Sequence, residues 1–200
     1  MTSDDRIRAL EAFGYTLSEA AFLCLAALHS GYFLRRQFRR FANASRGYRD
    51  DLLIEKLLSK KHGQVFTSGK KTIVYHLCSR PFYSTIGQPN NRHRRERPPF
   101  AVKAKLMAFD YVLANQEHRY LAIEEEKVGY FTGELGIEID LLPIKTYSSR
   151  KTESTTDRYF VDKFPIFLTA PSHQPVVSFC YIDEAVIATP GFETYLKQYM

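Results

Sequence analysis

Apolar residues recur with helical spacing near the start of the chain. Ile7 and Leu10 share one side of a short helix predicted over residues 4–13. A second helix is predicted in "TLSEAAFLCLAALHSG". Ser18 is expected to cap it, with Glu19 in its first turn, and Gly31 is expected to end it.

Two further helices are predicted within and after an arginine-rich stretch. Leu34, Phe38 and Phe41 stand at i, i+4 and i+7, which is the spacing of one helical face. "NAS" at residues 43–45 has turn chemistry, because Asn and Ser compete for backbone hydrogen bonds. The next helix is expected to start near Ser45 or Arg46 and to reach about Lys61.

"QVFTSGKKTIVYHL" (64–77) predicts a β-hairpin. Two runs rich in β-branched and aromatic residues flank a turn that contains Gly69. A helical segment followed by such a hairpin has the parts of a winged helix-turn-helix, in which the last helix enters the major groove of DNA. The predicted fold class is therefore α+β, with an N-terminal winged helix-turn-helix over residues 1–80.

The rest of the chain is predicted to form a connecting segment and a second domain. Residues 81–100 contain breakers and the basic run "RHRRER", which predicts a linker or arm. Residues 101–200 predict an α/β domain for dimerisation, ligand binding or a partner. Its elements are helices at 101–116 and 124–137, the second interrupted by Gly129, strands at 157–168 and 175–185, and a final helix in "GFETYLKQYM". That last helix has no stop signal, so we expect a chain truncated after Met200.

Charge divides the chain unequally. Residues 1–105 hold 20 Lys and Arg against 8 Asp and Glu, a net charge of +12, whereas residues 106–200 hold 8 against 14, a net charge of −6. A basic half joined to an acidic half predicts a polyanionic partner for the basic half only.

Basic side chains recur at the positions where a winged helix meets DNA. The predicted DNA-binding residues are Arg35, Arg36, Arg39 and Arg40 on the helix that crosses the backbone, Ser45, Arg46, Tyr48 and Arg49 at the front of the groove helix, Lys70 and Lys71 at the wing tip, and Arg92, Arg94 and Arg95 in the arm. Base reading is expected from Arg46, Tyr48 and Arg49. The "RHRRER" run is either an arm in the minor groove or a charged linker.

The stretch from "SGYFLRRQF" through "LLIEKLLSKKHG" to "TIVYHL" resembles the winged-helix segment of bacterial DNA-binding proteins. Over residues 15–78 it is similar to plasmid replication–relaxation proteins of mobile elements. The resemblance implies a sequence-specific double-stranded DNA-binding protein that regulates transcription or replication of such an element. By analogy with winged-helix proteins, it also implies a homodimer.

Sequence motifs give little support to an enzyme. The six histidines show no HxxxH or HxH spacing, and no Cys/His cluster, P-loop or GxSxG is present. We therefore expect no catalytic residues, no cofactor and no metal. Glu125 and Lys127 lie in "EEEK", where a solvated helix face is the simpler interpretation.

Two alternative functions stay open. In the first, Asp157, Asp162, Asp183 and Glu184 meet around Mg²⁺ in a nuclease or nicking enzyme delivered by the winged helix. In the second, the basic surface docks an acidic protein, or the acidic half binds a protein partner. Three separated cysteines and the lack of a signal peptide or a long apolar run predict a cytoplasmic protein with no membrane contact.

Overall fold

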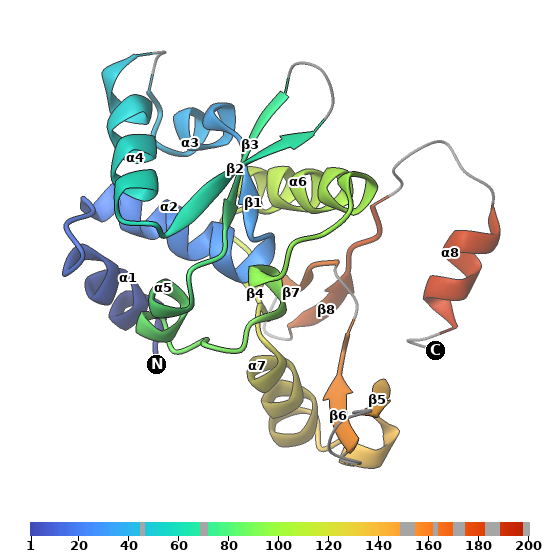
Figure 1. Ribbon diagram of the computed structural model, residues 1–200. Helices are drawn as coiled ribbons and strands as arrows, with labels where there is room; N and C mark the ends of the chain where they lie inside the picture. Colours follow the sequence, from blue (N-terminus) through green and yellow to red (C-terminus); the bar gives the residue numbers. More distant parts are fainter. Residues whose placement is uncertain are drawn as a thin grey trace. The chain divides into compact units, whose positions relative to one another are not determined.

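The computed structural model describes residues 1–44, 47–68, 72–148, 155–161, 164–169, 175–182 and 189–197 (Figure 1). The fold is α+β with small antiparallel sheets. The chain forms two compact units, Met1–Asn115 and Gln116–Met200. Over these ranges the first unit carries 20 Lys and Arg against 9 Asp and Glu, and the second 8 against 13, so the net charges are +11 and −5.

The first unit combines helices with one three-stranded sheet. Its helices are α1 (Ser3–Glu11), α2 (Leu17–His29), α3 (Arg35–Phe41), α4 (Tyr48–Ser59), α5 (Arg80–Thr85), the 3-10 turn η1 (Arg92–Arg94) and α6 (Pro99–Ala114). Its strands are β1 (Tyr32–Phe33), β2 (Gly63–Ser68) and β3 (Thr72–Leu77), in the order β1-β3-β2. The predicted helices and the hairpin are confirmed, whereas the short strand β1 was not anticipated.

Capping explains where α2 begins and ends. Thr16, rather than Ser18, is its N-cap: the Thr16 hydroxyl accepts from the Glu19 amide, and the Glu19 carboxylate accepts from the Thr16 amide. Gly31 follows the helix with φ +78°, a conformation that favours glycine, and its amide donates to the Ala26 carbonyl at 2.7 Å. The predicted end of the helix at Gly31 is thus confirmed.

The core of the first unit lies on both faces of the sheet. Phe33, on one face, packs edge-on against Phe22 of α2, and Phe22 also contacts the rings of Phe38, Phe41 and Phe109. Tyr32, the preceding residue, lies on the opposite face with Val74 and with Val102 of α6. Alternation along β1 therefore directs Phe33 toward α2 on one side of the sheet and Tyr32 toward Val102 of α6 on the other, and Phe109 of α6 also reaches Phe22.

The segment predicted as a linker belongs to the first unit. Residues 81–100 contain α5 and η1, and α6 packs on the sheet, so the division between units falls after Asn115 instead of around residues 81–100. The physical reason is burial within the segment. The side chains of Phe82, Tyr83 and Ile86 are fully buried, and His93 is almost so. The helix-breaking residues and the positive charge of this segment predicted an exposed arm. The buried side chains of Phe82, Tyr83 and Ile86 instead hold the segment in the core.

The described residues of the second unit form two antiparallel sheets. Its elements are β4 (Arg119–Tyr120), α7 (Glu124–Gly129), the π-helical turn η2 (Tyr130–Glu134), the 3-10 turn η3 (Ile139–Leu141), β5 (Ile144–Ser148), β6 (Thr155–Tyr159), β7 (Ile166–Thr169), β8 (Val176–Phe179) and α8 (Thr189–Leu196). One sheet has the order β4-β7-β8, and β5 pairs with β6 in a separate ribbon.

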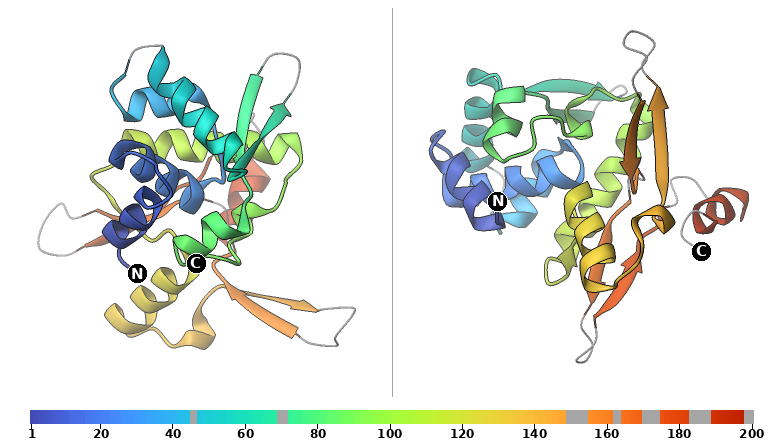
Figure 2. Two further views of the ribbon diagram at one scale, coloured as in Figure 1. Left: turned by 60° about the vertical axis from the view of Figure 1, so that its left-hand side comes forward. Right: turned by 90° about the horizontal axis from the view of Figure 1, so that it is seen from below.

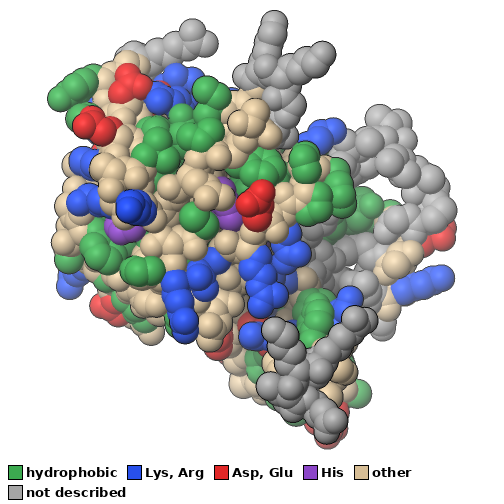
Figure 3. All heavy atoms as spheres, viewed as in Figure 1, with side chains coloured by type: hydrophobic (Ala, Val, Ile, Leu, Met, Phe, Trp, Pro, Cys, Tyr) green, Lys and Arg blue, Asp and Glu red, His purple; other side chains and the backbone are tan. Residues whose placement is uncertain are grey.

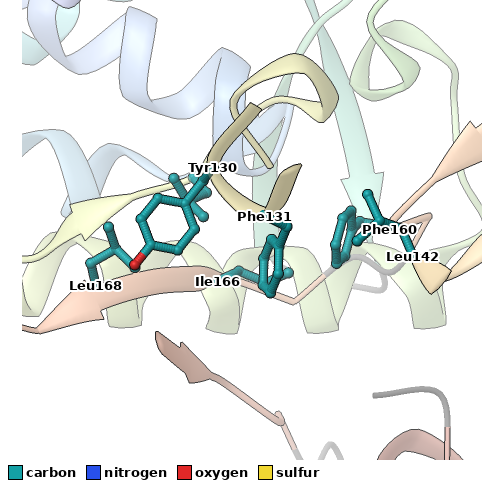
Figure 4. Packing of buried hydrophobic residues seen from close by; sticks show 7 residues of the cluster. Tyr130, Phe131, Leu142, Phe160, Ile166 and Leu168 are labelled. Carbon is teal, nitrogen blue, oxygen red and sulfur yellow. The ribbon is translucent and has the colours of Figure 1, made fainter. Parts of the chain in front are cut away.

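The single strand predicted over residues 157–168 is two strands in different sheets. β6 ends at Tyr159, and Phe160 then adopts φ +47°, which extended backbone does not allow. β7 begins directly after Pro165, and its residues Ile166–Leu168 are buried. Figure 4 shows Tyr130 and Phe131 beside Ile166 and Leu168, with Phe160 and Leu142 completing this core.

Candidate nucleic-acid interface

The front of α4 presents an aromatic and a cationic side chain to solvent. Leu53, Ile54 and Leu57 bury one face of the helix. Gly47 precedes the helix with φ +145°, and Tyr48 and Arg49 occupy its first turn. Tyr48 is 76% exposed, and Arg49 is exposed as well. Neither has a hydrogen bond or ion pair within the described part of the chain.

Two of the α3 arginines bind carboxylates at the start of α4. The guanidinium of Arg35 contacts Asp51, lies 3.6 Å from an oxygen of Asp50 and donates to the Tyr75 hydroxyl at 2.9 Å. The Tyr75 hydrogen bond, followed by the contact with Asp51, raises the pKa of Arg35. Arg39 lies 3.4 Å from Asp50. These ion pairs therefore hold α3 against α4. The carboxylates of Asp50 and Asp51 compensate most of the positive charge of the two arginines.

A third arginine of this helix binds α6. Arg36 donates to both oxygens of Asp110, at 2.9 and 2.6 Å. This two-pronged contact raises the pKa of Arg36. Buried Gln37 donates from its amide nitrogen to Asp110 and to the Leu106 carbonyl, each at 3.0 Å. Arg40 is exposed and has no carboxylate partner among the described residues.

Three of the four α3 arginines predicted to face DNA therefore bind carboxylates instead. Only Arg40 has no carboxylate partner among the described residues. The carboxylate partners Asp50, Asp51 and Asp110 were not anticipated. "RDD" at 49–51 is visible in the sequence, and acidic residues suit the first turn of a helix. Which arginine each would meet depends on how α3 and α4 pack, and this is not encoded in spacing along either helix.

The predicted basic arm is a packed turn. The ring of His93, in η1, is buried, and the His93 carbonyl accepts from Nε2 of His76 at 3.0 Å. Arg94 donates to the Pro89 carbonyl at 2.6 Å. Arg95 is exposed and Arg92 is half-buried. Figure 3 shows Lys and Arg side chains gathered on the face where η1 lies, so the segment keeps a cationic surface without being a free arm.

This cationic turn stands at the end of the sheet away from the hairpin tip. His76, which binds it, pairs with Gln64 near the start of β2, whereas Ser68 pairs with Thr72 at the other end. His76 is four residue steps from Thr72, a distance of about 13 Å along β3. The predicted tip residues Lys70 and Lys71, and Ser45 and Arg46 before α4, lie outside the described residues.

A buried polar cluster attaches η1 and α6 to the sheet. Nζ of Lys105 donates to the Ser30 carbonyl at 2.8 Å and contacts Nδ1 of His93. The rings of Tyr32 and His76 are stacked, with centroids 4.1 Å apart. This cluster fixes the position of η1 relative to β3.

Of the four acidic residues considered for a metal, only Asp157 lies in the described part of the chain. No group of three or more His, Cys, Asp or Glu side chains with metal-binding geometry occurs among the described residues. Asp157 accepts from the Thr146 hydroxyl at 2.6 Å, whereas Asp162, Asp183 and Glu184 fall outside the described ranges. In α7, Glu125 is exposed but Lys127 is buried, so "EEEK" is not uniformly a solvated face.

Comparisons with known proteins give no significant match: no family model matches the chain, nor does any curated protein or solved structure. In the described part of the chain, no helix is both long and apolar enough to cross a membrane.

Proposed function

We propose that the first unit is a winged helix-turn-helix that binds double-stranded DNA. The observation that carries the proposal is the order α2, β1, α3, α4, β2, β3 with the sheet order β1-β3-β2. In this arrangement α3 and α4 are the helix-turn-helix and the β2–β3 hairpin is the wing. The net charge of +11 on this unit supports a polyanionic partner.

The contacts of the arginines divide the proposed DNA-binding residues into two groups. Arg49 and Tyr48 at the front of α4 are proposed to read base edges, and Arg40 is proposed to contact phosphate, because their side chains are exposed and uncommitted within the described chain. Arg35 and Arg39 hold α4 through Asp50 and Asp51, so we assign them to positioning. Arg46, Lys70 and Lys71 keep their proposed roles on the sequence pattern alone.

The proposed biological role rests on the resemblance of residues 15–78 to plasmid replication–relaxation proteins. On that basis the chain regulates transcription or replication of a bacterial mobile element, binds DNA as a homodimer, and offers its acidic unit to a protein partner. A two-fold dimer places its two groove helices about one turn of DNA apart or a multiple of it, so the target is expected to be an inverted repeat.

The test is a salt titration of binding to a fluorescent duplex of about 30 base pairs, close to three turns of DNA. The variant Arg40→Ala/Arg49→Ala removes two uncommitted cations. We expect the slope of log K against log salt to fall by about 0.9, because only Arg40 is assigned to phosphate, and affinity to fall by at least about eightfold near 0.1 M salt.

The matched control is Arg8→Ala/Arg80→Ala, which removes two exposed arginines from α1 and α5 of the same unit. We expect both the salt slope and the affinity to stay close to wild type. Equal losses in the two double variants would mean that binding follows net charge and not the α4 surface. Absence of wild-type binding at low salt would contradict the proposal.

A further inference from the structure

The β5–β6 ribbon is exposed along nearly its whole length. All five residues of β5 and the first four of β6 are exposed, although the strands are fully paired from Ile144–Tyr159 to Ser148–Thr155. Figure 2 shows the two strands side by side, leading away from the helical turns that precede them. An isolated two-stranded ribbon is marginally stable in water, so this exposed length contributes little to the stability of the unit.

The base of the ribbon is nevertheless held firmly. The amide of Phe160 donates to the Pro143 carbonyl at 2.9 Å, and the side chains of Leu142 and Phe160 lie in the core of the unit. Glu124 at the start of α7 accepts from the Tyr159 amide at 3.0 Å and from Arg158 at 3.3 Å. These contacts fix the direction in which the ribbon leaves the core.

One face of the ribbon places two cations opposite each other. Lys145 pairs with Arg158, and Tyr147 pairs with Thr156 on the same face. Directly opposed like charges destabilise a β-pair. Glu124 contacts Arg158, but Lys145 meets no carboxylate in the described part of the chain and lies over the Tyr147 ring, with Nζ 5.6 Å from its centroid. Lys145, the Tyr147 ring and the Thr156 hydroxyl therefore form a surface complementary to phosphate.

This cationic face is unusual for its unit. The second unit carries a net charge of −5, and three acidic residues open α7 beside the ribbon base. The opposite face of the ribbon is different in kind: it carries Ile144, Thr146 and Ser148 against Tyr159, Asp157 and Thr155, so its only charge is negative. Positive charge is therefore concentrated on one side of an exposed element.

We propose that this face of the β5–β6 ribbon is a second DNA-binding surface, in which Lys145 contacts the phosphate backbone and Arg158, paired with Glu124, fixes the base of the ribbon. The inference rests on the proposed function, because it assigns the same duplex to a second element of the chain. A major groove about 12 Å wide admits a two-stranded ribbon, and five residues of strand extend about 17 Å, enough to cross it. Thr156 and Tyr147 add hydroxyl donors for phosphate oxygens.

The test uses the full chain and three variants in the same salt titration. Lys145→Ala removes one phosphate contact, so the slope is expected to fall by about 0.9 and affinity by about eightfold near 0.1 M salt. Lys197→Ala removes an exposed lysine from the other end of the same unit and is expected to bind like wild type. Lys145→Glu repels phosphate, so it is expected to bind more weakly than Lys145→Ala.

Lys145→Glu also separates DNA binding from a structural role. It places a carboxylate opposite Arg158, so the thermal stability of the variant should equal or exceed that of wild type while DNA affinity falls. A fall in stability together with affinity would overturn the proposal, and so would unchanged affinity in both Lys145 variants. Unchanged affinity with an altered mass by light scattering would assign the ribbon to contacts between copies of the chain.

The outcomes distinguish this inference from the function on which it rests. If wild type binds DNA, Arg40→Ala/Arg49→Ala loses affinity and the Lys145 variants do not, the ribbon assignment fails alone. If the Lys145 variants lose affinity and the α4 variant does not, the ribbon assignment stands and the α4 surface fails. If wild type does not bind the duplex, both fail.

Discussion

Arg36 in α3 and Asp110 in α6 form a two-pronged ion pair across 74 positions of sequence, with donor–acceptor distances of 2.9 and 2.6 Å. The pair joins a helix of the proposed helix-turn-helix to a helix that the sequence assigns to a different domain. Asp110 also accepts from Gln37, whose side chain is buried. The contact therefore makes α6 part of the unit that holds α3.

This contact predicts unequal effects of removing its two partners. Asp110→Ala leaves the buried Gln37 amide with one fewer acceptor, so we expect it to lower the free energy of unfolding by about 1–3 kcal/mol. Arg36→Ala should lower it by less. A double-mutant cycle measured by urea unfolding should give a coupling energy of up to about 1 kcal/mol, because Arg36 is half exposed. A coupling energy of zero would mean that the pair does not join α3 to α6 in solution.

The two neighbouring aspartates at the start of α4 are expected to differ in importance. Asp50 is buried, accepts from the Gly47 amide at 3.3 Å and lies near both Arg35 and Arg39, whereas the side chain of Asp51 is 65% exposed. Asp50→Ala should lower the free energy of unfolding by about 1–3 kcal/mol, and Asp51→Ala by less than about 1 kcal/mol. Urea unfolding of the two variants makes the comparison, and equal losses would argue against the assigned geometry.

Gly31 offers a direct test of the packing of η1. Its φ is +78°, and a Cβ there would lie 2.4 Å from the His93 carbonyl oxygen. Backbone strain at alanine is expected to lower the free energy of unfolding of Gly31→Ala by about 1–3 kcal/mol. Displacement of η1 by the new Cβ should lower it further. Tryptic cleavage after Arg92, Arg94 or Arg95 should become faster.

The matched control for this variant is Gly129→Ala. Gly129 ends α7 with φ −59°, and no atom lies within 4 Å of the Cβ position. Alanine there should be neutral or stabilising by up to about 1 kcal/mol. If Gly31→Ala is as mild as this control in denaturation, η1 does not pack against Gly31 as described.

Burial of two histidines predicts how stability depends on pH. Desolvation lowers the pKa of His62, and that of His76, below the ordinary value of 6.5. Because the unfolded chain then binds protons more readily, the free energy of unfolding falls as pH drops below about 7 toward the lowered pKa values, and does not change through these groups above that range. Urea unfolding from pH 8 to pH 5 measures the profile.

The variant His62→Asn isolates one of these groups. Nδ1 of His62 lies 2.9 Å from the Tyr15 hydroxyl, and an asparagine amide offers a hydrogen-bonding partner that does not titrate. The variant should show a shallower decline of stability between pH 7 and pH 5 than wild type. A slope identical to that of wild type would mean that His62 does not titrate on unfolding.

Local pattern alone was enough to locate most elements of the first unit. The helical face of Phe38 and Phe41 and the hairpin over residues 64–77 were predicted from spacing, because helix and strand periods are properties of adjacent residues. The same reasoning anticipated Gly31 as a helix end. It failed at β1, where two residues are too few to show a period.

What the chain determined by itself, then, is which segments are helical or extended and where positive charge accumulates. Tertiary structure decided that Arg35, Arg36 and Arg39 bind carboxylates, that residues 81–100 pack through His93, and that residues 157–168 divide at Phe160 between two sheets. It also decided that Lys145 and Arg158 stand opposite each other. Each of these depends on residues far apart in sequence, whose approach is set by the packing of whole elements rather than by the local preferences of either segment.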